Sequence, residues 1–250
     1  MNTISLGNVV GSNICNLLLV LGASSVFGKV VARREVIRRD FVYVLIATTT
    51  IFLLSLEYFI AGKDHGIITR ANGIVLLMFL VIYLYTLIRD SRHSKPEDEE
   101  ITPFKVKDIF LVVLGAAGII LGGNAVVDGA TNLASNMGIS ENVIALTIVA
   151  VGTSLPELVT SVVAVKKHES DIAIGNVIGS NIFNILFILG LSSTISPITY
   201  ELESFFDIIV MLGATVLVYL FFLKRKSIGR YKGIILLTLY FSYITYILLR

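Results

Sequence analysis

The chain has 250 residues, of which 55% are hydrophobic and 15% are charged, and its mean hydropathy is +0.86. A soluble domain carries about 25% charged residues, so this composition excludes an ordinary soluble enzyme and predicts a polytopic membrane protein whose partner is the lipid bilayer. The net charge of +2 gives no indication of nucleic-acid binding. The single Cys15 excludes an intrachain disulfide and a cysteine-built metal site.

Eight apolar segments are long enough to cross a bilayer as helices, which requires ~17–25 residues each. They lack the short alternating pattern of a transmembrane β-barrel, so the expected fold class is all-α. The predicted spans are about 7–27, 41–61, 67–88, 106–128, 142–165, 172–195, 205–223 and 232–249.

Basic residues gather in every second connection between these spans. Of the 20 Lys and Arg, only Lys63, Arg70 and Arg250 fall on the other side. Because positively charged loops stay in the cytoplasm, we predict that both termini of this chain face outward. The polar connection 89–105 ends in an acidic run, which we interpret as part of a solvated cytoplasmic linker, with a regulatory cation site as the alternative.

The predicted span 142–165 contains a polar stretch, AVGTSLPE, at 150–157. Pro156 has no N–H to donate and clashes with the carbonyl four residues earlier, so the helix must bend or break. Broken backbone at membrane depth is tolerated where protein or a watery cavity satisfies it. Thr153, Ser154 and Glu157 then offer the oxygen ligands that Ca²⁺ or Na⁺ prefers. The alternative is a proline kink packed with small residues, which leaves Glu157 unexplained.

An internal repeat relates the two ends of the chain. The sequence GNVVGSNICN at 7–16 returns as GNVIGSNIFN at 175–184, and GIVLL at 73–77 returns as GIILL at 233–237. The first three spans therefore correspond to the last three. A complete repeat would have five spans, and because five is odd, the two repeats would have inverted topology.

The fourth and fifth predicted spans have no counterpart upstream. We therefore expect an inverted-repeat membrane protein with eight of ten transmembrane helices. Residues 1–88 would be the remainder of the first repeat, 89–105 the linker and 106–250 the second repeat. Transporters of this design bind substrate near the midplane, where broken helices of both repeats meet.

The motif GTSLPE at 152–157, followed by GNVIGSN at 175–181, resembles the α-repeat of the cation/calcium exchanger superfamily, and in particular the prokaryotic sodium/calcium exchangers. The resemblance extends over essentially the whole chain. It implies an antiporter in a prokaryotic cell membrane that exchanges Ca²⁺ for Na⁺ by alternating access, without a cofactor and without enzymatic activity.

The resemblance also implies a set of cation ligands, with Glu157 as the principal carboxylate. The other implied ligands are Thr153, Ser154, Ala150 through its carbonyl, Ser180, Asn184, Ser12 and Asn16. Ser180 and Asn184, like Ser12 and Asn16, are four residues apart and so share one helix face. We interpret Asn8, Asn13, Asn176 and Asn181 instead as amides that bond across a helix interface.

Two departures from the family pattern affect the predicted site. Some relatives carry an aspartate where Asn184 stands, and the first repeat's counterpart of Glu157 is absent. The other acids, such as Glu57, Asp108, Asp128 and Asp207, lie near predicted span ends, where water can reach them. One carboxylate with half of the oxygens cannot readily assemble the ~6–8 ligands of Ca²⁺. We therefore expect this chain to bind Ca²⁺ poorly, and to need the missing N-terminal helices for exchange.

Three alternatives remain at this point. One is H⁺-coupled exchange with Glu157 as the titrating group, and another is a chain without transport activity of its own. An intramembrane serine enzyme is a third, but Lys166 and Lys167 lie at the cytoplasmic end, away from Ser154. In the family, the span 106–128 slides against the core, and its Gly115, Gly118, Gly122 and Gly123 would suit either sliding or ordinary close packing.

Overall fold

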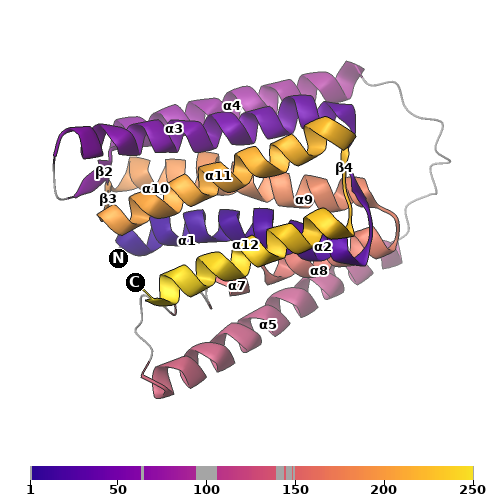
Figure 1. The fold of residues 1–250 in the computed structure, drawn as a ribbon. Helices are drawn as coiled ribbons and strands as arrows, with labels where there is room; N and C mark the ends of the chain where they lie inside the picture. Colours follow the sequence, from indigo (N-terminus) through magenta and orange to yellow (C-terminus); the bar gives the residue numbers. More distant parts are fainter. Residues whose placement is uncertain are drawn as a thin grey trace.

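The computed structural model describes residues 2–62, 65–93, 106–138, 144, 148 and 150–249. Within these residues, seven helices are long and apolar enough to cross a membrane (Figure 1). They are Leu6–Phe27, Val36–Tyr58, Arg70–Arg92, Lys107–Asn136, Ser170–Ile195, Glu203–Arg225 and Arg230–Leu249. They coincide with seven of the predicted spans, and the predicted span 142–165 lies partly outside the described residues. The protein is an all-helical integral membrane protein.

The first three spans are built from six helical pieces. The N-terminal rod consists of α1 (Asn2–Ile14), the π-helical turn η1 (Cys15–Val20) and α2 (Leu21–Phe27). The backbone stays right-handed helical at Ile14 and Val20, so the three pieces form one continuous rod. The second span joins the π-helical η2 (Val36–Asp40) to α3 (Phe41–Ile60), and the third is α4 (Arg70–His93).

The second span begins earlier than predicted because Arg38 and Arg39 are part of η2. Long basic side chains can keep their stems against apolar surface while the charge reaches the interface, so such residues extend a span that hydropathy alone would end.

The second part of the chain repeats this design after one additional long helix and one broken helix. Its helices are α5 (Val106–Asn136), α7 (Ala150–Thr153), α8 (Leu155–Lys166), α9 (Ser170–Phe183), the π-helical η4 (Asn184–Leu189), α10 (Gly190–Ile195), α11 (Leu202–Arg225) and α12 (Arg230–Leu249). The rod α9–η4–α10 carries the repeated motif, and in Figure 1 it runs opposite to α1–η1–α2. The related segments therefore have inverted directions.

Two short antiparallel strand pairs tie the related halves together at opposite ends of the bundle (Figure 1). At one end, β1 (Val30–Val31) pairs with β4 (Ser227–Ile228), with Val30 opposite Ile228. At the other, β2 (Gly66–Ile68) pairs with β3 (Ile198–Tyr200), with Ile68 opposite Ile198. Each pair joins a strand from one half to a strand from the other.

Glycines allow the rods to pack against the last helix of the opposite half. The helix α2 packs on α12, and α10 packs on α4. A Cβ at Gly233 would lie 2.8 Å from the carbonyl oxygen of Gly22, and a Cβ at Gly73 would lie 2.6 Å from that of Gly190. A larger residue cannot fit without a backbone shift, so these crossings depend on glycine.

A tyrosine and an aspartate form a matching contact in each half. The Tyr83 hydroxyl donates to Asp40 over 3.4 Å, and the Tyr243 hydroxyl donates to Asp207 over 3.1 Å. The prediction that water reaches Asp207 is wrong, because its exposed fraction is 4%. That prediction rests on the nearness of Asp207 to the end of its span. The packing of α12 brings Tyr243 onto the Asp207 carboxylate and so removes this carboxylate from water.

The helix α5 lies at the edge of the bundle and contacts α7 and α8 (Figure 1). None of its most apolar stretch is buried. A Cβ placed on Gly115, Gly118 or Gly122 would meet no atom within 4 Å. These three glycines are therefore not used for close packing against another described helix.

Candidate functional site

The site centres on the break between α7 and α8. The backbone leaves the helical region at Ser154, with φ −99° and ψ 2°, and the Ser154 N–H donates to the Val151 carbonyl over 3.0 Å. The predicted break is confirmed, but it lies before Pro156, which belongs to the first turn of α8. A proline is tolerated in the first turn because the N–H groups there have no intrahelical acceptor to lose.

Glu157 also lies in the first turn of α8. A carboxylate is stabilised at this end of a helix by the partial positive charge of the free N–H groups. The Ser180 hydroxyl of α9 donates to its Oε1 over 3.3 Å, while its Oε2 is buried without a hydrogen-bond partner. The structure thus brings the predicted Glu157 and Ser180 together.

Asn176 fixes α8 against α9. Its amide donates to the carbonyl oxygen of Glu157 over 3.2 Å and to the Ser161 hydroxyl over 3.0 Å. The prediction that Asn176 bonds across a helix interface is confirmed. Its contact on Glu157 makes it a support for the candidate site as well.

The first repeat reaches the break through Ser12. Its Oγ lies 2.9 Å from the Thr153 Oγ1, and either hydroxyl can be the donor. Ser12 and Ser180 are equivalent in the repeat, and they meet Thr153 and Glu157, respectively, on either side of Ser154. Ala150, the first residue of α7, lies about one turn before the break.

Four asparagines form a hydrogen-bonded cluster between the two rods. Asn16 donates to Asn181 Oδ1 over 3.1 Å, and Asn184 donates to Asn13 Oδ1 over 3.0 Å. Asn13 and Asn181 also each donate to the other's backbone carbonyl over 3.5 Å. The interface role predicted for Asn13 and Asn181 is confirmed, and the predicted ligands Asn16 and Asn184 are their partners.

Eight buried side-chain oxygens of the described residues have no hydrogen-bond partner, and three of them belong to predicted ligands: Asn16 Oδ1, Ser154 Oγ and Glu157 Oε2. A buried oxygen without a partner costs about 1–3 kcal/mol, so such groups are rare unless they have a function. Carboxylate, amide and hydroxyl oxygens suit hard cations such as Na⁺ and Ca²⁺ rather than soft transition metals.

The candidate site around the break between α7 and α8 is open on one side. Thr153 is exposed, and Glu157 and Ser180 are only partly buried. Among the described residues, no group of three or more His, Cys, Asp and Glu is placed to hold a metal ion. The arrangement therefore has one carboxylate and several neutral oxygens.

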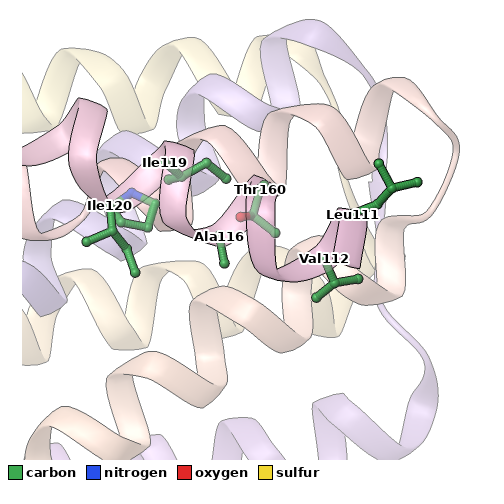
Figure 2. Close-up of a pocket in the computed structure, with 8 residues that line it drawn as sticks. Leu111, Val112, Ala116, Ile119, Ile120 and Thr160 are labelled. Atoms are coloured by element: carbon green, nitrogen blue, oxygen red, sulfur yellow. The ribbon is translucent and has the colours of Figure 1, made fainter. Parts of the chain in front are cut away.

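A separate apolar cavity of about 400 Å³ lies between α5 and α8 (Figure 2). Leu111, Ala116 and Ile119 line it from α5, and Pro156 and Thr160 line it from α8. Since its walls are almost wholly hydrocarbon, it is suited to an apolar neighbour and not to an ion.

Two features of the site were not predicted from the sequence. The π-helical turns η1 and η4 begin at Cys15 and Asn184, beside the candidate ligands, and such turns are frequent at functional sites. The partners of the asparagine cluster were also missed. The repeated Asn-x-x-Asn spacing at 13–16 and 181–184 is the sequence signal that could have identified these hydrogen-bond partners.

The inverted rods and the broken, oxygen-lined helix between them define a membrane transporter of the inverted-repeat class. The chain matches the family profile of the sodium/calcium exchanger protein over residues 1–89 and 107–249. It therefore belongs to the sodium/calcium exchanger family of cation antiporters and is not an enzyme.

Individual relatives agree with this assignment. The chain is 35% identical to the membrane protein MJ0091 of Methanocaldococcus jannaschii, over 95% of this chain and 74% of that one. It is 29% identical to the sodium/calcium exchanger MaX1 of Methanosarcina acetivorans, over 96% of this chain and 79% of that one. The solved structure of the sodium-calcium exchanger NCX_Mj, soaked with Na⁺ and Sr²⁺, is similar with a TM-score of 0.77 and 34% identity, over 98% of this chain and 76% of that one. This chain is thus about three quarters as long as these three proteins.

Proposed function

We propose that this protein exchanges Ca²⁺ for Na⁺ by alternating access at the break between α7 and α8. The observation that carries the proposal is the set of three buried oxygens without partners on Asn16, Ser154 and Glu157. They come from both related halves, as expected of a midplane site in an inverted-repeat transporter. The proposed ligands are Glu157, Thr153, Ser154, the carbonyl of Ala150, Ser180, Asn184, Ser12 and Asn16.

The choice of Ca²⁺ and Na⁺ follows from the ligand chemistry and from the family. All side-chain ligands are oxygen donors, and one carboxylate supplies the negative charge. The names of MaX1 and NCX_Mj describe sodium/calcium exchangers, which supports the same ions here.

The proposed site is complete only with further ligands. Ca²⁺ takes ~6–8 oxygens, and a second carboxylate would balance its charge. We propose that residues 1–88 and 106–250 are the two related halves, joined by 89–105. We also propose that two further helices in the first half would bring the number of spans to ten and supply the counterpart of Glu157. Without them, exchange should be slow or absent.

The orientation is also part of the proposal. Both termini lie at the same end of the bundle (Figure 1). The described basic residues between the spans lie mostly at the other end, so by the positive-inside rule we propose that the termini lie outside the cell.

The proposal can be tested by the effect of ions on the purified protein. In this chain supplied with the two N-terminal helices of a full-length relative, Ca²⁺ and Na⁺ should each slow the alkylation of a cysteine placed at Gly179, beside the proposed ligand Ser180, in a Cys15→Ser background. Glu157→Gln should remove this protection. Glu57→Gln is a matched control, because it removes an exposed carboxylate at the end of α3. Equal protection of the introduced cysteine with Glu157 intact and in the Glu157→Gln variant would refute the site.

The coupling ion is tested in proteoliposomes that contain this chain together with the two N-terminal helices of a full-length relative. Uptake of ⁴⁵Ca²⁺ that depends on an outward Na⁺ gradient supports Na⁺ coupling. Uptake that follows a pH gradient and ignores Na⁺ would instead identify H⁺ as the coupling ion.

A further inference from the structure

A second cavity, which is polar, lies away from the break between α7 and α8, where η2 meets the C-terminal end of α4. It has a volume of about 420 Å³ and is lined by Arg34, Glu35, Arg38, Arg39 and Asp90. Every lining residue is charged. This volume lies within the range of about 300–1,000 Å³ that is typical of small-molecule sites.

Only some of the arginines that line this cavity form ion pairs with acidic side chains. Arg39 binds Asp40 over 2.7 Å and Asp90 over 3.2 Å, and Arg89 also approaches Asp90, over 3.6 Å. Arg34 and Arg38, by contrast, are exposed and form no ion pair with any residue in the described ranges. They are four residues apart, so both guanidinium groups can reach the same ligand.

These two arginines are not needed to build this corner of the fold. The Tyr243–Asp207 contact repeats the Tyr83–Asp40 contact at the other end of the bundle. Aligned on the two aspartates, Glu201 stands where Arg34 stands and Phe205 where Arg38 stands. The same corner thus forms without the basic residues, and the positive charge belongs to one face alone.

The cavity lies at the depth of lipid headgroups. The candidate span Val36–Tyr58 begins beside it, and Arg70–Arg92 ends beside it. Along α4, Leu87 is exposed one turn before Asp90 on the same helix face, so apolar surface borders the cavity on the side toward the bilayer core. A phosphodiester at the cavity, with acyl chains along α4, would match both surfaces.

We propose that this cavity binds the headgroup of an anionic phospholipid, with Arg34 and Arg38 on its phosphate. Guanidinium groups bind phosphate oxygens through paired hydrogen bonds, and basic pockets between spans are typical sites of anionic lipid headgroups. The Arg39–Asp90 pair forms the floor of the site and holds α4 against η2.

The test measures lipid retention by native mass spectrometry of the purified chain with phosphatidylglycerol or phosphatidylcholine. Wild type should retain phosphatidylglycerol in preference to phosphatidylcholine. The double variant Arg34→Gln/Arg38→Gln should bind phosphatidylglycerol about 25-fold more weakly, since each arginine near the surface contributes a factor of about five. The double variant Lys224→Gln/Arg225→Gln removes two exposed charges from the end of α11, at the same end of the bundle, and should retain the lipid.

Three results would overturn the proposal. Equal loss in both double variants would mean that the whole basic face attracts lipid without a specific site. Inorganic phosphate that displaces phosphatidylglycerol at millimolar concentration would assign the cavity to a soluble anion. Lipid retention that appears only after the acidic run 97–100 is changed to glutamines would assign it to the chain's own linker.

Discussion

The asparagine cluster between the two rods allows a quantitative test of the fold around the site. Asn16 and Asn181 have exposed fractions of 1% and 0%, and their side chains are joined by one hydrogen bond of 3.1 Å. Changing each to alanine, singly and together, isolates the interaction in a double-mutant cycle. Interhelical hydrogen bonds in membrane proteins measured in this way average about 0.6 kcal/mol and reach about 1.7 kcal/mol. Because this amide pair is fully buried, we expect a coupling energy of about 1–1.7 kcal/mol.

The assay is unfolding of the purified protein in mixed micelles by increasing sodium dodecyl sulfate, followed by circular dichroism. The cycle on Asn13 and Asn184, joined over 3.0 Å, should give a coupling energy within about 0.5 kcal/mol of the first, because the two contacts are related by the repeat. Asn72, at the far end of α4, bonds locally to Thr69 and should be additive with Asn16. Zero coupling in both cycles would refute the cluster, and coupling in one alone would refute its symmetry.

Four further substitutions separate packing from function. Gly233→Ala should destabilise the protein by about 1–3 kcal/mol, because the added Cβ would meet a backbone carbonyl. Gly118→Ala, on the exposed face of α5, should be neutral or slightly stabilising. Sodium dodecyl sulfate titration compares the stabilities of the two variants. Tyr243→Phe removes a donor from the buried Asp207 and should cost about 1.5–3 kcal/mol in the same titration, and an unchanged midpoint would contradict a structural role for this contact. Ser154→Ala removes a buried hydroxyl that has no oxygen or nitrogen partner among the described residues, so stability should change little while cation protection of the site weakens. A loss of stability with intact protection would show that the hydroxyl is structural.

The arrangement of the helices followed from the sequence where a pattern was long or repeated. The Gly-Asn motifs at 7–16 and 175–184 predicted two related rods, whereas the crossings at Gly22 and Gly190 were not predicted. The hydroxyls and proline at 153–156 predicted the break, because a missing N–H has a definite structural consequence.

Other features depend on contacts between distant segments and could not be predicted. Asp207 is buried because Tyr243, from another helix, covers it. The charges at Arg34 and Arg38 were counted toward topology, but the cavity that they line forms only when η2 and α4 meet. The π-helical turns η1 and η4 were not predicted either.

The central claim is that Glu157 belongs to a cation site that this chain supplies in part. The most direct measurement is Na⁺-dependent ⁴⁵Ca²⁺ uptake into proteoliposomes by this chain alone and by this chain supplied with the two N-terminal helices of a full-length relative. Each form is measured with Glu157 intact and as the Glu157→Gln variant. We predict uptake only when the helices are supplied, and its loss on Glu157→Gln. Equal uptake by the chain alone, or uptake that survives Glu157→Gln, would contradict the account.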